Sequence, residues 1–178
     1  MNLTIEDIVT IFRTKGDRAY GGEAISQLEH ALQCATLAEG KNSKPELIVA
    51  SLLHDLGHLL SDTEKTSKND FHEHKVVPYL KKLFGLAVSE PVRLHVEAKK
   101  YLCAVDSDYW ESLSPTSKQS LERQGGIFSE ADAEKFMTKP YALQAVRLRS
   151  WDDRAKVVGL STPDLNYFVP VIINCIQK

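Results

Sequence analysis

The chain carries histidine and aspartate residues of metal-binding type in several separate segments. They are His30, His54, Asp55, His72, His95 and Asp152. Histidine and carboxylate donors without thiolate suit iron, manganese, magnesium or zinc rather than soft-metal centres. A carboxylate beside a histidine ligand can also bridge two metal ions, because its two oxygens can face different ions. The set therefore predicts a metal centre.

The His54-Asp55 pair lies between leucines in the apolar sequence ASLLHDLGHLL. A buried carboxylate is costly, so Asp55 needs a strong partner. His58 follows Asp55 by three residues and His54 by four, so on one helix all three would point to neighbouring parts of one face. The simpler alternative is a His–Asp pair that only hydrogen-bonds in the core. Candidate ligands on separate helices, including His30 on the inner stripe of the preceding helix, favour the metal site.

The order of these residues resembles the HD superfamily of metal-dependent phosphohydrolases and related oxygenases. The pattern H…HD…D is present as His30, His54-Asp55 and Asp152. Members with two metals add two histidines between HD and the final Asp. His72 and His95 lie where those are expected, so the resemblance implies two metal ions.

The segment HEHKVVPYL contains two histidines, of which one matches the family pattern HExxGAxxL. His72-Glu73 and Leu80 match, whereas two valines replace the small pair. This spacing favours His72 over His74 as the ligand. His74, two residues further on, would face away on a helix and is expected at the surface.

A longer resemblance points to one group within the superfamily. The segments YGGEAISQLEHALQCA, LLHDLGH, HVEAKKYL, LSPTSKQSLERQGG and RSWDD resemble the phosphonate-cleaving mixed-valent diiron HD oxygenases. Those enzymes convert 2-amino-1-hydroxyethylphosphonate to glycine and phosphate. The similarity extends from about Tyr20 to Asp153, and it implies two iron ions, Fe(II) and Fe(III), with O2 as co-substrate and a small organophosphonate as substrate.

The resemblance also implies roles for the individual residues. One iron would be held by His30, His54, Asp55 and Asp152, and the second by Asp55, His72 and His95, with Asp55 bridging. The phosphonate would meet His58, Lys99, Ser117 and Arg149. Lys99 follows His95 by four residues and Arg149 precedes Asp152 by three, so one helix face can present a ligand and a cation together. A guanidinium and an ammonium suit a dianionic group.

Ordinary solvated charges remain the alternative for both cations, and Lys100 and Arg147 are expected to be such bystanders. Tyr20 and Glu23 resemble a gate, in which the phenolate occupies an open iron position until substrate displaces it. Nearby glycines would give this loop backbone freedom. In this reading Tyr20, Glu23 and His58 are the catalytic residues. The alternative is that Tyr20 packs as an aromatic at a helix entry while Glu23 serves the first turn.

The predicted function is therefore a diiron oxygenase that cleaves the C–P bond of 1-hydroxy-2-aminoethylphosphonate, or of its N-trimethyl analogue, giving phosphate and glycine or glycine betaine. A quaternary amine would favour an aromatic cage, for which Tyr101, Tyr109 and Trp110 are available. The main alternative is a metal-dependent HD phosphohydrolase acting on a nucleotide or other phosphoester. A diiron oxygenase that cleaves a polyol C–C bond and a non-catalytic metal-binding module are further alternatives.

Helices must position these residues. Apolar periodicity and turn signals predict helices over about 3–12, 25–39, 45–60, 72–84, 89–102, 115–123, 129–137, 141–156 and 163–176, with a polar loop at Ser61–Asp70. Ser114 is expected as an N-cap with Pro115 in the first turn, and Gly125-Gly126 is expected to end that helix. No alternating strand pattern of useful length occurs. We expect an all-α HD-domain helical bundle forming one domain over 1–178, with the metal-binding core at about 20–155.

Composition excludes some other classes. Hydrophobic residues make up 43% of the 178 residues, enough for a core without disulfides. The net charge of −2 gives no basic field for nucleic acid or an anionic membrane. The three cysteines have no CxxC spacing and are expected as buried thiols of a reduced compartment. No apolar run is long enough to suggest a membrane span, and the first residues do not resemble a signal peptide, so a cytoplasmic protein is expected. The oligomeric state is not predicted.

Overall fold

The computed structural model describes residues 3–60 and 72–177. Within these ranges the secondary structure consists of α-helices, with one isolated bridge between Ala19 and Ser26 and no strand, so the all-α prediction is confirmed. The helices are α1 (Ile5–Lys15), α2 (Gln27–Glu39), α3 (Pro45–Leu53), α4 (Leu56–Leu59), α5 (His72–Phe84), α6 (Leu86–Val105), α7 (Ser107–Ser112), α8 (Pro115–Arg123), α9 (Glu130–Met137), α10 (Ala142–Arg154) and α11 (Leu165–Asn174). The predicted loop at 61–70 lies outside the described residues.

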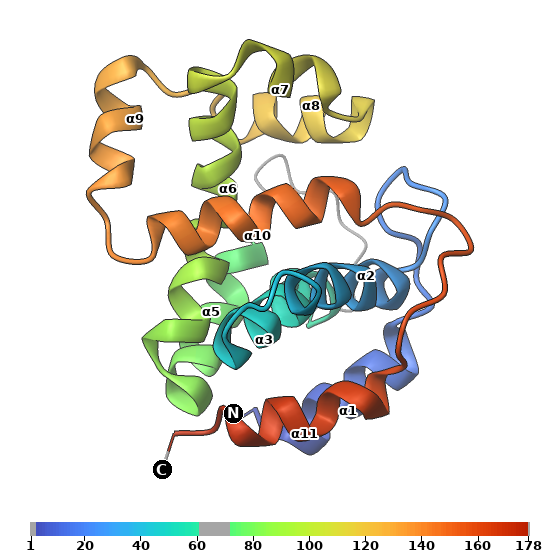
Figure 1. Cartoon of the computed structure of the whole chain (residues 1–178). Helices are drawn as coiled ribbons and strands as arrows, with labels where there is room; N and C mark the ends of the chain where they lie inside the picture. Colours follow the sequence, from blue (N-terminus) through green and yellow to red (C-terminus); the bar gives the residue numbers. More distant parts are fainter. Residues whose placement is uncertain (1–2, 61–71, 178) are drawn as a thin grey trace.

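The centre of the molecule is formed by α2, α3, α5, α6 and α10. Figure 1 shows α10 crossing the molecule between the α2–α3 pair and the group made by α7 and α8. Helix α10 contacts α6, α2 and α3, and α5 packs along α6. The largest apolar cluster runs through these helices to α1 and α11 and includes Phe12, Leu53, Leu80, Trp151 and Phe168. The inner faces of the central helices therefore meet in one region.

Local signals define several helix ends, and those of α8 are the ones that the sequence predicts. Ser26 caps α2 in a reciprocal capping box with Glu29, which satisfies two backbone donors at the helix start. Ser114 accepts the backbone N–H of Ser117 at the start of α8, and Pro115 lies in the first turn. Gly125 and Gly126 adopt φ values of +100° and +77° directly after α8. Since L side chains avoid this region, these glycines end the helix.

One predicted helix is interrupted at its functional residues. The sequence favours a continuous helix to Leu60, but α3 ends at Leu53 and α4 begins at Leu56. Asp55 adopts φ −101° and ψ 6°, a sparsely populated conformation that recurs in active sites. The prediction of one helix was wrong because apolar periodicity does not register a single-residue break. The break turns the Asp55 carboxylate away from the direction it would have on a continuous helix.

Helix α6 and its continuation also differ from the prediction. Helix α6 begins at Leu86 rather than at about 89, after Gly85 with φ +78°, and it extends to Val105. The short helix α7 was not expected. The Asp106 side chain caps it by accepting the backbone N–H groups of Asp108 and Tyr109. Within residues 3–60 and 72–177, none of the helices combines the length and apolar character needed to cross a membrane.

Candidate dinuclear metal centre

A first group of donors comes from α2, the end of α3 and α10. The Nε2 atoms of His30 and His54 lie 3.3 Å apart, and His30 Nε2 lies 3.3 Å from Asp152 Oδ1. His54 Nε2 lies 3.3 Å from Asp55 Oδ2. All four side chains have 10% or less of their surface exposed. The structure therefore brings together the four residues expected around one ion.

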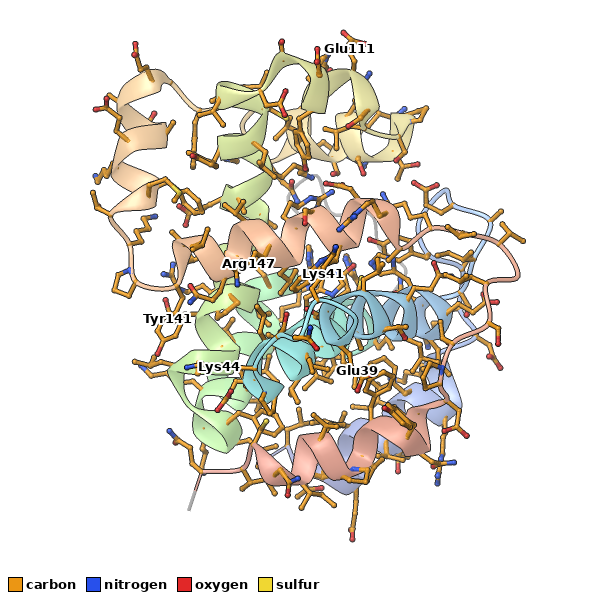
Figure 2. All side chains as sticks on the ribbon, viewed as in Figure 1. Glu39, Lys41, Lys44, Glu111, Tyr141 and Arg147 are labelled. Atoms are coloured by element: carbon orange, nitrogen blue, oxygen red, sulfur yellow. The ribbon has the colours of Figure 1, made fainter. Side chains whose placement is uncertain are left out.

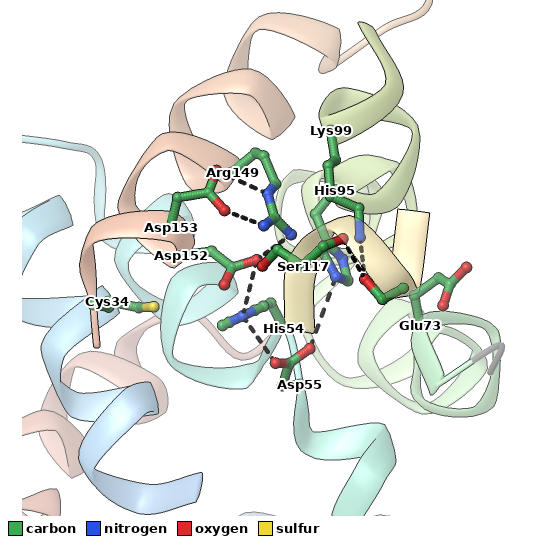
Figure 3. A network of polar contacts seen from close by, with 12 residues as sticks. Cys34, His54, Asp55, Glu73, His95, Lys99, Ser117, Arg149, Asp152 and Asp153 are labelled. Carbon is green, nitrogen blue, oxygen red and sulfur yellow. Dashed lines mark hydrogen bonds and ion pairs between the residues drawn. The ribbon is translucent and has the colours of Figure 1, made fainter. Parts of the chain in front are cut away.

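A second group comes from α5 and α6 and faces the other oxygen of Asp55. His72 Nε2 lies 3.0 Å from Asp55 Oδ1, and His95 Nε2 lies 3.8 Å from the same oxygen. The Nε2 atoms of His72 and His95 are 3.1 Å apart. One carboxylate thus turns Oδ2 toward the first pair of histidines and Oδ1 toward the second pair. This is the arrangement of a bridging ligand, and Figure 3 shows Asp55 below His54 and His95.

The hydrogen bonds of the imidazoles fit metal binding. The Nδ1 atoms of His30, His54 and His95 lie 2.8, 2.8 and 2.7 Å from the backbone carbonyls of Ala155, Ser51 and Val92. A carbonyl accepts only, so each Nδ1 carries the proton and each neutral ring presents an Nε2 lone pair to the centre of the site. Two such lone pairs at 3.3 Å repel each other unless a cation lies between them. Ligands at about 2.0–2.1 Å from one ion come this close to each other.

Electrostatics keep the two carboxylates ionised and the His95 ring neutral. Burial alone would raise the pKa of Asp55, but His54 and His72 hold it well below its usual value. Burial opposes ionisation of Asp152 as well, yet Arg149 lowers its pKa well below the usual value. Burial and the neighbouring histidine His72 lower the pKa of His95, which keeps that ring neutral. Two carboxylates and neutral imidazoles are a suitable donor set for iron, manganese or zinc.

Tyr20 lies beside the first group of ligands. Its ring stacks on His30 with the centroids 3.8 Å apart and the planes at 16°, and its hydroxyl donates to Asp152 Oδ1 at 3.3 Å. Burial and the carboxylates of Asp152 and Asp55 raise the pKa of Tyr20 well above its usual value. In the described structure the Tyr20 hydroxyl is therefore hydrogen-bonded to a candidate metal ligand. Gly21, with φ +55°, follows it in the loop.

Glu23 joins this loop to the start of α8 and to the segment after α10. Its Oε1 accepts a hydrogen bond of 2.7 Å from the hydroxyl of Ser114 and lies 3.5 Å from Nζ of Lys156. Nζ of Lys156 also donates to Ser117 Oγ at 3.0 Å. The predicted gate residues therefore contact the same segment that carries Ser117.

The residues expected to bind a phosphonate converge from three helices. Figure 3 shows Lys99 from α6, Ser117 from α8 and Arg149 from α10 above the His54–Asp55 pair. Lys99 is 2% exposed, donates to Ser120 Oγ at 2.6 Å, and has its pKa lowered to about 7 by burial and by Arg149. A buried ammonium group with a hydroxyl contact is a suitable partner for an anion.

Arg149 and His58 complete this side of the site. Arg149 lies 2.6 Å from Asp152 Oδ2, contacts Asp153, and donates to the hydroxyl of Tyr109 at 3.2 Å. His58 stacks on His72 with the ring centroids 4.0 Å apart, and its Nε2 lies 3.9 Å from Asp55 Oδ1. Its side chain is 31% exposed. His58 therefore lies at an accessible edge of the second donor group.

Comparisons with known proteins identify the family of this chain. The HD domain family matches residues 28–136 of this chain. The chain belongs to the HD domain family. It is 39% identical to the hydroxymethylphosphonate dioxygenase of Gimesia maris, over 99% of this chain and 97% of that protein. It is 36% identical to the [1-hydroxy-2-(trimethylamino)ethyl]phosphonate dioxygenase (glycine-betaine-forming) of Leisingera caerulea, over 98% of this chain and 91% of that protein.

The expected bystanders of this HD protein lie away from the site. The side chain of His74 is 57% exposed. Lys100 Nζ lies over the ring of Phe128, 5.7 Å from its centroid. Arg147, labelled in Figure 2, is exposed on α10. Neighbouring positions in one helix therefore separate into site residues and surface residues, as the helical period predicts.

The aromatic residues available for a cage have other partners in the structure. Tyr101 packs on Phe136, with the ring centroids 5.3 Å apart. Trp110 lies under Nζ of Lys118 at 5.2 Å. Tyr109 turns its hydroxyl to Arg149 and Asp153. Each of the three side chains is therefore engaged by residues of the chain itself.

Sequence reasoning gave no site role to Cys34, Asp153 and Lys156. It offered Tyr109 only for an aromatic cage and not as a partner of Arg149. Cys34 follows His30 by four residues, and its Sγ lies 3.7 Å from His30 Nε2, so helical spacing could have found it. The fourth residue after Asp152 is Lys156, but it lies beyond the end of α10. Nothing in the sequence indicates that Tyr109 reaches Asp153.

Proposed function

We propose that this chain is a diiron oxygenase that uses O2 to cleave the carbon–phosphorus bond of a 1-hydroxyalkylphosphonate. The overall reaction balances without a further reductant, since one hydroxyalkylphosphonate and one O2 give one carboxylate and one phosphate. The candidate substrates are 2-amino-1-hydroxyethylphosphonate and its N-trimethyl analogue, which would give glycine and glycine betaine. Hydroxymethylphosphonate, the substrate in the name of the Gimesia maris relative, would give formate.

The observation that carries the proposal is the position of Asp55 between two histidine pairs, with buried cations on one side. Asp55 turns one oxygen to each pair, at 3.3 Å from His54 Nε2 and 3.0 Å from His72 Nε2. Lys99 and Arg149, both at least 95% buried, lie where an anion bound at such a centre would need positive charge. Both named relatives above are dioxygenases of phosphonates, which supports the oxygenase assignment.

The irons would be held by the two donor groups described above, and when bound they supply the one-electron chemistry and the activation of O2. The protein binds, orients and encloses the substrate. Lys99 and Ser117 would donate hydrogen bonds to the phosphonate from α6 and α8. Arg149 is held by Asp152 and Asp153, so its guanidinium contributes a fixed positive charge and needs no reorientation when the anion arrives.

The segment of Tyr20 and Glu23 would close the site. Tyr20 donates to the ligand Asp152, and Glu23 is tied to α8 through Ser114, so moving this segment breaks both contacts. We expect substrate entry to displace Tyr20 from the first donor group. His58, at the exposed edge of the second group, is placed to hydrogen-bond the phosphonate or to exchange a proton with solvent.

A metal-dependent phosphohydrolase would use the same metal ligands, so its test is the demand for oxygen. Iron-loaded protein should release phosphate from a 1-hydroxyalkylphosphonate under air and consume one O2 per phosphate. Anaerobic incubation should abolish the release. Undiminished turnover without O2, or hydrolysis of phosphoesters by the manganese-loaded protein at higher kcat/KM, would refute the oxygenase assignment.

A further inference from the structure

A cation site made from protein side chains lies at the edge of the proposed phosphonate site. The carboxylate of Glu23 and the ring of Tyr20 both contact a single ammonium group, that of Lys156. Nζ of Lys156 lies 3.5 Å from Glu23 Oε1 and 5.9 Å from the centroid of the Tyr20 ring. A carboxylate and an aromatic face are groups that attract an ammonium ligand. In this chain, Lys156 occupies the place that such a ligand would take.

Lys156 is fixed in this place by more than one contact. Its Nζ donates to Ser117 Oγ at 3.0 Å, and the side chains of Lys156 and Glu23 are only 13% and 19% exposed. Glu23 also accepts a hydrogen bond of 2.7 Å from the hydroxyl of Ser114. Partial burial strengthens the ion pair, because water screens it less than at an open surface.

The other carboxylates near the site are also engaged. Apart from the proposed metal ligands, the described residues bring Glu23, Asp153 and Glu73 to this region. Asp153 is bonded to Arg149 and to the hydroxyl of Tyr109. Glu73 Oε2 lies 3.5 Å from His72 Nδ1, behind the ring whose Nε2 faces Asp55. Glu23 is therefore the carboxylate with access to the substrate side, and Lys156 neutralises it.

The aromatic side chains near this region already have partners within the chain. Tyr101 packs on Phe136, and Trp110 lies under Lys118. The ring of Tyr20 is stacked on His30 and lies beneath Nζ of Lys156. The two rings that face a cation, those of Tyr20 and Trp110, therefore already face a lysine of the chain.

We propose that Lys156 is a specificity-determining residue which selects 1-hydroxyphosphonates without a cationic amine. The inference rests on the function proposed above and narrows its substrate class. Lys156 neutralises Glu23 and donates to Ser117, so the carboxylate that could attract a substrate ammonium is already paired. An ammonium or trimethylammonium at C2 would have to displace Lys156 from Glu23 or lie next to it, and like charges at that distance repel. Hydrogen or a small neutral group at C2 meets no such cost.

The test compares kcat/KM for phosphate release from three substrates by the iron-loaded full chain under air. These are hydroxymethylphosphonate, 2-amino-1-hydroxyethylphosphonate and its N-trimethyl analogue. The unmodified protein should prefer hydroxymethylphosphonate by at least roughly tenfold. Lys156→Met should move this ratio toward the two cationic substrates, because it leaves Glu23 negative. Glu23→Gln should move the ratio in the opposite direction, because it leaves Lys156 without its counter-charge.

Two further variants control the comparison. Lys156→Arg keeps the charge and should keep the preference, and Lys41→Met, at an exposed lysine labelled in Figure 2, should leave the ratio unchanged. Using ratios removes effects that are common to all substrates, such as loss of the Lys156–Ser117 contact. If Lys156→Met does not fold, Glu23→Gln still tests the direction of the shift.

The experiment distinguishes a failure of this inference from a failure of the proposed oxygenase function. Equal or higher kcat/KM of the unmodified protein for a cationic substrate, or ratios that do not change in the Lys156→Met and Glu23→Gln variants, would overturn the inference and leave the oxygenase function intact. Absence of phosphate from all three substrates would overturn the proposed function. In that case calorimetric binding of the same three phosphonates to the iron-loaded protein without O2 reads the charge preference directly, and tighter binding of a cationic compound would overturn the inference too.

Discussion

Gly57 in α4 lies directly against the backbone carbonyl of His72 at the start of α5. A Cβ atom built on Gly57 would lie 2.0 Å from that carbonyl oxygen. The absence of a side chain at position 57 therefore permits the contact between α4 and α5 that brings His72 to within 3.0 Å of Asp55. The second group of ligands depends on this close approach.

We expect Gly57→Ala to displace His72 and to weaken the second metal site. The overpacking should lower the free energy of unfolding by about 1–3 kcal/mol. Iron content measured after purification should fall from two ions toward one per chain. Gly40→Ala is the matched control, because Gly40 is in helical conformation and its Cβ would be 3.4 Å from the nearest atom. Full iron loading of the Gly57→Ala variant would contradict this role.

Lys99 predicts a pH dependence of substrate binding. Its pKa is lowered to about 7 by burial and by Arg149, so its ammonium charge is lost as the pH rises above 7. KM for a phosphonate should therefore increase above pH 7, approaching about tenfold per pH unit. Lys99→Met should raise KM at pH 6.5 and flatten this dependence. Dividing the KM of Lys99→Met by the KM of the unmodified protein at each pH removes the effect of titration of the substrate, which both proteins share.

The lowered pKa of Lys99 also makes the stability of the folded protein depend on pH. Because the pKa of Lys99 is lower in the folded protein than its ordinary value of 10.5, folding favours the neutral amine. The contribution of Lys99 to stability therefore increases as the pH rises from about 7 toward 10.5. Unfolding by urea at pH 7 and pH 9 should show a smaller pH effect in Lys99→Met than in the unmodified protein. Lys100→Met, whose ammonium lies over Phe128, is the control and should not change the effect.

Tyr109 and Asp153 should act as positioning residues for Arg149. The Tyr109 hydroxyl bonds Asp153, and both contact the guanidinium. Tyr109→Phe should raise KM for the phosphonate by about tenfold or more, with little change in kcat, since a hydrogen bond to a charged group contributes about 1.5–3 kcal/mol. Tyr101→Phe, in which the ring still packs on Phe136, should leave KM unchanged. A fall in kcat at constant KM for Tyr109→Phe would argue against positioning.

The sequence singles out candidate ligands by their types and order, and the structure brings these side chains together. His30, His54, Asp55, His72 and Asp152 can be read from motifs, and helical period separates site residues from bystanders. The break at Asp55 could not be predicted, because the flanking leucines continue the apolar pattern of a helix.

The pairing of charged groups around the proposed substrate site is even harder to predict from sequence than the break at Asp55, because it depends on tertiary structure. The pairs Glu23–Lys156 and Tyr109–Asp153 join residues 133 and 44 positions apart. No local sequence pattern predicts either pair. The short helix α7, which carries Tyr109, has no apolar stripe from which it could be predicted. Sequence spacing predicts which side chains share a helix face, but it does not predict which acidic side chain pairs with which basic side chain.

The central claim is that Asp55 bridges two irons, and iron analysis combined with electron paramagnetic resonance of the unmodified protein and of Asp55→Ala tests it most directly. We expect two irons per chain and the spin-coupled signal of a mixed-valent pair in the unmodified protein. In Asp55→Ala that signal should be absent and no dinuclear centre should load, while circular dichroism retains the helical spectrum. A single iron in the unmodified protein, or a coupled pair that persists in Asp55→Ala, would contradict the account.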